Sequence, residues 1–139
     1  MNPAKSVSYM LTPATEGVIT QALADMPFGL NGLRRICLHS NTASPLHVMM
    51  IEAKDVMAFP AHSHPNDELI MVKKGAMMVS YVSNKADKGI ELNAGAILLI
   101  PANTVHLVNF LAPGTVFYEV KAGPFDENST IFASDNEIQ

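Results

Sequence analysis

The sequence predicts an all-β domain, a barrel of short strands with one short helix in front of it. From residue 33 onward the chain consists of short apolar runs bounded by turn residues such as Asn31-Gly32 and Pro113-Gly114. Before that point, a single stretch repeats its apolar residues at helical spacing. Three of the five histidines lie in strand-like runs at spacings that suit a first-row divalent metal, which indicates a metal site inside the barrel.

The expected helix lies near the N-terminus, where Thr12 and Pro13 supply an N-cap and a first-turn proline. Apolar residues then recur at helical spacing until Pro27 and Gly29 end the pattern; they are Val18, Ile19, Leu23 and Met26. A short amphipathic helix of this kind packs on the outside of a barrel or on a partner subunit. We assign it no catalytic role.

Strands are expected after the helix, because runs of strand length alternate with turn residues. They lie at roughly residues 33–40, 46–52, 67–73, 76–83, 88–92, 96–100, 104–111 and 115–121. Residues 83–89 form a polar loop, and the tail is polar apart from Ile131 and Phe132. The chain therefore divides into an N-terminal arm with the helix (1–32), a β-barrel (33–125) and a C-terminal tail (126–139).

The candidate metal ligands are His62, His64, Glu68 and His106. Side chains two apart on a strand point to the same face, so His62 and His64 can hold one ion between them. Glu68 lies four residues further on, again an even number, and His106 begins another apolar run that can lie beside the first. We expect these groups to bind one divalent transition metal, Fe, Mn, Ni, Zn or Cu, and to leave one or two coordination positions open.

Two segments around these ligands resemble the two motifs of the cupin family. Residues 59–68, followed by Gly75, are similar to the first motif, and residues 95–109 are similar to the second. The resemblance implies a cupin barrel, also called a double-stranded β-helix or jelly roll. Asn103 stands where the family has a glycine, and because asparagine tolerates positive φ we expect the turn there to persist.

A narrower resemblance extends from residue 34 to residue 133. Residues 34–40, the later Pro45 and residues 114–126 are similar to the WbuC-type cupin fold metalloproteins. Membership of that family implies a link to bacterial surface-polysaccharide biosynthesis. Since one cupin barrel hosts dioxygenases, isomerases, lyases and plain binding proteins, the resemblance predicts the fold far better than the reaction.

Length, charge and cysteine content exclude several classes of protein. A chain of 139 residues fits one domain. The net charge of −4 and the lack of a basic stripe argue against nucleic-acid binding. No apolar run reaches membrane-spanning length, so we expect a cytoplasmic protein that binds no membrane. The one cysteine, Cys37, is expected to be a small buried hydrophobe, and His47 is expected to be structural.

Several of the expected strands are apolar on both faces. If Glu68 faces the ion, Leu69 and Met71 lie on the outer surface of the barrel and need cover. Residues 77–79 and 97–100 repeat this pattern. A homodimer joined sheet to sheet supplies the cover, and so does the helix or the N-terminal arm; the sequence does not separate these alternatives.

On two other expected strands, alternate side chains share one face and are candidates to lie around the metal. Glu119 and Lys121 share one face with Phe117, and Arg35 shares another with His39. We expect Glu119 and His39 to transfer protons, and Arg35 and Lys121 to bind an anionic substrate. A solvated edge for Arg35 and a surface ion pair between Glu119 and Lys121 are the alternatives.

Two functions follow from these expectations. As an enzyme, the protein would act on a small sugar-derived or acidic metabolite by isomerase, epimerase, lyase or dioxygenase chemistry. A divalent ion with one glutamate ligand keeps about one net positive charge, which favours an anionic ligand. As a non-catalytic module, the same site would bind a carbohydrate or carboxylate. The sequence has no nucleophile motif, phosphate loop or dinucleotide fingerprint.

Overall fold

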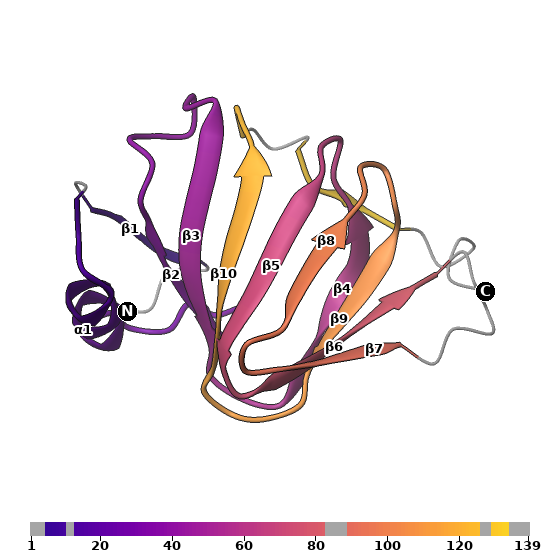
Figure 1. The fold of residues 1–139 in the computed structure, drawn as a ribbon, viewed down its shortest axis with the longest axis horizontal. Coiled ribbons are helices and arrows are strands. Elements are labelled where there is room, and N and C mark those ends of the chain that lie inside the picture. Colours follow the sequence, from indigo (N-terminus) through magenta and orange to yellow (C-terminus); the bar gives the residue numbers. More distant parts are fainter. Residues whose placement is uncertain (1–4, 11–12, 83–88, 126–128, 134–139) are drawn as a thin grey trace.

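Two β-sheets form the structure, a computed structural model that describes residues 5–10, 13–82, 89–125 and 129–133 (Figure 1). The strands of the six-stranded sheet are, in order, β1 (Ser6–Tyr9), β2 (Leu33–Cys37), β3 (Leu46–Ala53), β10 (Thr115–Ala122), β5 (Glu68–Lys74) and β8 (Ile97–Ile100). Those of the five-stranded sheet are β11 (Ile131–Phe132), β4 (Met57–Ser63), β9 (His106–Phe110), β6 (Ala76–Tyr81) and β7 (Ile90–Asn93). The expected all-β jelly roll with a short N-terminal helix is confirmed.

Strand β10 holds the larger sheet together. It pairs antiparallel with β3 on one side, from Thr115↔Ala53 to Ala122↔Leu46, and with β5 on the other side. Its partners lie far back in the chain, so these pairings join distant parts of the sequence, as a jelly roll requires. Side chains on the inner face of β10 therefore lie beside those of both β3 and β5.

The hydrophobic core fills the space between the two sheets. On β5, buried Ile70 and Val72 alternate with Leu69 and Met71, which are only partly buried. Residues of the opposite sheet complete the cluster, among them Met77, Val79, Val108 and Phe110. The predicted inward row of β5 is thus confirmed, and Glu68 is its first, buried member.

The helix α1 (Glu16–Ala24) lies at the β2–β3 end of the larger sheet and covers its outer face there (Figure 1). Its buried residues Ile19 and Leu23 pack on Ile36 of β2 and Met50 of β3. The expected position on the outside of the barrel is confirmed, but the expected N-cap is wrong. Thr15 caps the helix instead of Thr12, because its hydroxyl accepts a hydrogen bond from the Val18 N–H at 3.3 Å.

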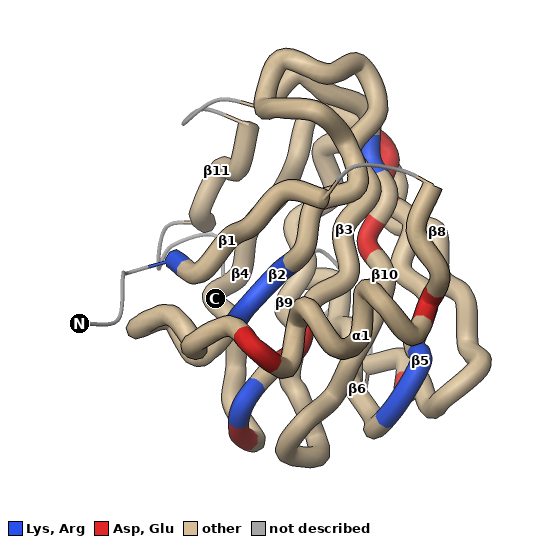
Figure 2. The backbone as a smooth tube through the Cα atoms, turned by 90° about the vertical axis from the view of Figure 1, so that its left-hand side faces the viewer, with Lys and Arg blue, Asp and Glu red and all other residues tan. Residues whose placement is uncertain are grey.

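Three observed strands are absent from the ranges expected from the sequence, although the spacing of the metal ligands already placed His62 on a strand. Strand β4 contains Pro60, which cannot donate to a ladder, and the pairing of β4 with β9 shifts register between Phe59 and His62. Strand β1 runs parallel to β2, and its polar Ser6 is buried while its apolar Val7 and Tyr9 are exposed, the reverse of the usual pattern. Strand β11 has only two residues. Basic residues lie at the start of β1 and along β2 (Figure 2). The sheets thus extend beyond residues 33–125, the range predicted for the barrel, and the domain boundaries stay a prediction.

Turn residues follow the sequence-based expectation where they are described. Asn103 has a φ of 58°, so asparagine does take the left-handed conformation there. Gly75 has a φ of 86°, and a Cβ at this position would lie 2.9 Å from the Cα of Thr115. The expected polar loop at 83–89 lies almost wholly outside the described residues. Among the residues that are described, no helix has the length and apolar character needed to cross a membrane.

Candidate metal centre

Two neighbouring segments bring the candidate ligands together. His62 lies on β4, His64 follows the last residue of that strand, and Glu68 opens β5 in the opposite sheet. His106 opens β9 and pairs directly with His62. The even spacing therefore gave the correct grouping for the wrong reason, because the chain crosses between sheets after His64 instead of continuing along one strand.

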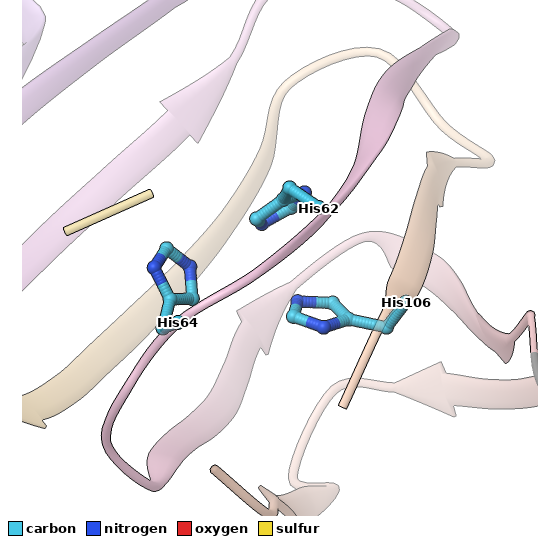
Figure 3. Close-up of side chains that lie close together, drawn as sticks. All are labelled: His62, His64 and His106. Carbon is cyan, nitrogen blue, oxygen red and sulfur yellow. The ribbon is translucent and has the colours of Figure 1, made fainter. Parts of the chain in front are cut away.

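The four side chains converge at one place inside the barrel. Ring nitrogens of His62, His64 and His106 all lie within 4.8 Å of one another (Figure 3). His64 Nε2 is 3.2 Å from Glu68 Oε2, and His106 Nε2 is 3.9 Å from the same oxygen. All four residues are buried. The structure thus places the three imidazoles where a single ion can bridge them, with the Glu68 carboxylate beside two of them, His64 and His106.

Backbone carbonyls orient each of the three rings. His62 Nδ1 is 2.7 Å from the Pro60 carbonyl oxygen, and His106 Nδ1 is 2.9 Å from that of Thr104. His64 Nδ1 is 2.9 Å from the carbonyl oxygen of Ser129. Because a carbonyl can only accept, each Nδ1 carries the proton and donates. Every Nε2 therefore keeps a free lone pair, which is the form of histidine that binds a metal.

Two buried acceptors in the cluster have no hydrogen-bond partner within the described part of the chain. They are Glu68 Oε2 and His106 Nε2. A buried polar atom without a partner is costly, and here acceptor atoms face one another with no donor between them. A cation between these acceptor atoms would interact with their lone pairs in place of a hydrogen-bond donor. The residues therefore fit a divalent transition metal.

Burial keeps the three imidazoles neutral at physiological pH. It lowers the pKa of His64 and His106, and it lowers the pKa of His62 to about 4. Burial also raises the pKa of Glu68 well above its usual range, and the neighbouring Glu119 carboxylate adds to this effect. A divalent cation would offset the cost of ionising Glu68, because an opposite charge favours the charged form.

Glu119 and Lys121 lie on the inner face of β10, beside this cluster. Lys121 Nζ is 3.1 Å from Glu119 Oε1, and the two side chains are only 9% and 13% exposed. Oxygens of Glu119 and Glu68 and a ring nitrogen of His64 also lie within 4.8 Å of one another. Burial acts to raise the pKa of Glu119, but the charges of Lys121 and Arg35 outweigh it and lower that pKa to about 2. The pair lies inside the barrel, so the surface ion pair is excluded.

One cavity of about 260 Å³ connects the cluster with these charged residues. His62, His64 and Glu68 line it at one side, and its lining also includes Arg35, Glu119 and Lys121. Apolar walls enclose the rest; among them are Phe59, Phe117, Phe125 and Phe132. The size suits a small metabolite, and the mixed lining is typical of ligand sites.

The structure does not bring His39 into this cavity. His39 lies instead in a second cavity, with its ring stacked on that of His47 at a centroid distance of 3.9 Å. From the sequence, His47 was expected to be structural. Its even spacing from Met49 and Ile51 on β3 nevertheless indicates that its side chain lies on the inner face. Sequence reasoning also missed Lys5, which lines both cavities, because β1 was not expected.

Comparison with protein families gives a match to the cupin domain over residues 47–118, which is more than half of the chain. The chain belongs to the cupin family. Both predicted cupin motifs, residues 59–68 and 95–109, lie within the matched range. No curated protein sequence matches the chain. The narrower WbuC-type resemblance stays a prediction.

Solved cupin structures share the fold at low sequence identity. KdgF from a Halomonas species aligns with a TM-score of 0.57 and 18% identity, over 70% of this chain and 84% of that one. An RmlC-like cupin from Shewanella frigidimarina gives 0.56 and 21%, over 70% and 80%. Oxalate decarboxylase from Bacillus subtilis gives 0.61 and 23%, over 74% of this chain but only 28% of that enzyme. At these identities the likeness shows the fold alone.

Proposed function

We propose that this cupin is a metal-dependent enzyme acting on a small anionic metabolite, sugar-derived or otherwise acidic. His62, His64, Glu68 and His106 would hold one divalent transition metal, Fe, Mn, Ni, Zn or Cu. When bound, such an ion supplies Lewis-acid chemistry at an oxygen of the substrate, or dioxygen chemistry if it is iron. Substrate binding and proton transfer are carried out by other residues that line the same cavity.

This proposal rests on the cavity that the metal-ligand cluster shares with other charged residues. The carboxylate of Glu119 and the cations Arg35 and Lys121 line the same space as the cluster. Structural metal sites are closed by protein groups, whereas this cluster borders a space of about 260 Å³. A substrate in that space touches the cluster and Glu119 at once. This arrangement favours isomerase, epimerase, lyase or dioxygenase chemistry over a purely structural metal.

Charge selects the class of substrate. A divalent ion with one glutamate ligand keeps about one net positive charge, and Arg35 adds another in the same cavity. Lys121 is largely neutralised by Glu119, 3.1 Å away. An oxygen-rich anion such as a sugar acid balances these charges, while the aromatic walls contact its carbon skeleton.

Glu119 is the group we assign to proton transfer. Lys121 and Arg35 keep its carboxylate ionised at neutral pH, which is the form that can accept a proton from a bound substrate. Lys121 fixes its orientation through the 3.1 Å ion pair. His39 lines only the adjoining cavity, so in this proposal it contacts the far end of the ligand and not the reacting atoms.

The proposal also includes a cytoplasmic location and a role in surface-polysaccharide biosynthesis. Both rest on the sequence, the second on the WbuC-type resemblance alone. They agree with a sugar-derived acid as substrate.

The test is turnover of a panel of sugar acids and hydroxy acids, followed by NMR, with the protein as purified. Replacing Glu119 by Gln should lower turnover about 10²- to 10⁴-fold while metal content stays unchanged, because only the proton-transfer group is lost. Exposed Glu91 on β7 provides the matched control, Glu91→Gln, which should keep full activity.

Saturable binding of these acids by the wild type without any conversion would contradict the enzyme. That result would favour the alternative, a non-catalytic module that binds a carbohydrate or carboxylate through its metal.

A further inference from the structure

A second cavity adjoins the one that holds the ligand cluster. It has a volume of about 210 Å³ and lies under β1 and β2, between them and the end of β10. Four residues line both cavities: Lys5, Arg35, Lys121 and Phe125. The two spaces are therefore neighbours that share these lining residues.

The lining of the second cavity is basic in a chain that is acidic overall. Lys5, Arg35 and Lys121 line it, and no aspartate or glutamate among the described residues does. Because Glu119 pairs with Lys121, the positive charge of this lining comes mainly from Lys5 and Arg35. The whole chain carries a net charge of −4, so this concentration of positive charge is local. Figure 2 shows basic residues at the start of β1 and along β2, the strands that form this wall. Such a lining attracts an anion.

Arg35 has no hydrogen bond or ion pair with any described residue, although it is half-buried. Its neighbour in the sequence, Arg34, differs because its side chain is hydrogen-bonded. Arg34 binds Glu52 Oε1 through Nε at 3.0 Å and Nη2 at 2.7 Å, and it also donates to the Met26 carbonyl at 2.7 Å. The two arginines point to opposite faces of β2, and only the inner one has its donors unused. A guanidinium is suited to grip a carboxylate or phosphate with two parallel hydrogen bonds.

His39 adds a neutral donor to the same cavity. His39 Nδ1 lies 3.1 Å from the Val48 N–H and 3.3 Å from the Val48 carbonyl oxygen. The shorter contact, in which the amide donates to Nδ1, places the ring proton on Nε2. That Nε2 has no hydrogen-bond partner among the residues that the structure describes. Burial and the adjacent His47 lower the pKa of His39, which keeps the ring neutral at physiological pH. The stacking on His47 holds the ring in place, and His47 itself is fixed by Thr42, whose carbonyl lies 3.2 Å from its Nε2.

We propose that the second cavity is an oxyanion subsite, in which Arg35, Lys5 and His39 bind a carboxylate or phosphate at the far end of the ligand. The ligand is then an elongated molecule with an oxygen-bearing end at the His62–His64–Glu68 cluster and an anionic end at Arg35. Only the first of these two ends rests on the proposed function. The subsite requires two functional groups in one substrate, and it disfavours short monoanions.

The first experiment titrates full-length protein, as purified, with inorganic phosphate and follows the ring signals of His39 by NMR. Wild type should show a saturable shift. Arg35→Gln should weaken phosphate binding about 10- to 100-fold, because a hydrogen-bonded charge is lost. The matched control is Arg34→Gln, which removes the same charge from the outer face of the same strand and should change affinity by less than about twofold.

A second variant separates the subsite from the metal cluster. His106→Ala removes a metal ligand but leaves the second cavity intact, so phosphate should bind it as it binds the wild type. His39→Phe keeps the ring stack while removing the Nε2 donor, and it should weaken binding about 3- to 10-fold. Three results would each overturn the subsite. The first is the absence of a saturable shift in the wild type, the second is an equal loss of affinity in both arginine variants, and the third is loss of phosphate binding in His106→Ala.

Dicarboxylates of three to six carbons, compared with acetate, test whether one ligand spans both cavities. At least one of them should bind wild type ten or more times more tightly than acetate, and Arg35→Gln should remove this advantage. Equal affinity for acetate and every dicarboxylate would contradict the spanning ligand. Failure of turnover would leave these binding results unchanged, so the subsite and the enzymatic proposal can fail separately.

Discussion

Hydrogen bonds to backbone carbonyls decide what the histidine cluster can do. Each Nδ1 of His62, His64 and His106 donates to a carbonyl oxygen, so each Nε2 is left as an acceptor. The sequence could predict which residues gather, because their spacing is visible. It could not predict the carbonyl partners, since Ser129 lies 65 positions from His64 and becomes its neighbour only in the folded chain.

Acid should destabilise the metal-free protein between about pH 6.5 and pH 4. The pKa values of His39, His62, His64 and His106 are lower in the fold than their ordinary value of 6.5, so the unfolded chain binds more protons in that window. The stability these neutral rings contribute is complete above pH 6.5 and is lost as the pH falls through their folded values. Glu68 acts in the opposite direction, because its pKa is raised, but it is one group against four.

Urea unfolding of chelator-treated protein at several pH values between 7.5 and 4 measures this effect. His62→Asn should reduce the slope of unfolding free energy against pH, because one of the four groups is removed. A free energy of unfolding that stays constant from pH 6.5 to pH 4 would contradict the burial of neutral histidines.

Cys37 should react slowly with thiol reagents in the folded protein. Burial raises the pKa of its thiol to about 11, so little thiolate is present at pH 8. The rate of modification at pH 8 should rise at least tenfold when the protein is unfolded in urea. Equal rates in the folded and unfolded protein would show that the thiol is accessible and ionised, against the buried position seen here.

At the level of elements, the strands with clean alternation were predictable and the irregular ones were not. Strand β5 alternates buried and partly buried residues, and its expected range of 67–73 is within one residue of the observed Glu68–Lys74. Strand β4 was missed although it holds His62, because Pro60 and a register shift interrupt its pattern. Strand β1 is short, and its pairing with β2 is parallel and non-local. Such pairing is decided by tertiary contacts and not by local propensity.

Gly75 connects β5 to β6, and replacing it should be costly. Gly75→Ala should lower the free energy of unfolding by about 1–3 kcal/mol, because φ is 86° and the new Cβ would lie 2.9 Å from the Thr115 Cα. Gly17→Ala is the control, since no atom lies within 4 Å of a Cβ at that helical position. It should stabilise the protein by about 0.5–1 kcal/mol. Urea denaturation of both variants gives the comparison, and equal effects would contradict the tight turn.

At the scale of the whole molecule, the sequence predicted a homodimer joined sheet to sheet, and that stays a prediction. The structure shows what such a dimer would cover. Helix α1 packs over β2 and β3, but on β8 the outward side chains of Ile97 and Leu99 are 64% and 55% exposed. They lie beside β5, whose outer residues Leu69 and Met71 are only partly buried. The helix therefore supplies part of the cover that the sequence called for and leaves the β5–β8 end of the sheet open.

If a second copy covers this end, Leu99→Glu should convert a dimer to a monomer. A charge placed in an apolar interface costs several kcal/mol, which is enough to dissociate most homodimers at micromolar concentration. Light scattering after size-exclusion chromatography measures the mass, with Val18→Glu on the exposed face of α1 as the control. A wild type that is monomeric at 100 μM would rule out the dimer.

The fold could be predicted from the sequence because each cupin motif is a continuous stretch of the chain. The substrate could not be predicted, because both cavities are built from strands distant in sequence. Arg35 on β2, Lys121 on β10 and Lys5 before β1 meet at one wall only after the sheet is assembled. Local patterns show which face each residue takes. They do not show which strands are neighbours.

In the proposed function, three histidines and Glu68 hold one metal ion beside a substrate cavity. Elemental mass spectrometry of protein purified without chelator tests it most directly, with His106→Ala and the control His47→Gln, which replaces a histidine outside the cluster. We predict about one transition-metal ion per chain in the wild type and in His47→Gln, and less than a tenth of that in folded His106→Ala. Full metal content in His106→Ala, or none in the wild type, would contradict the account.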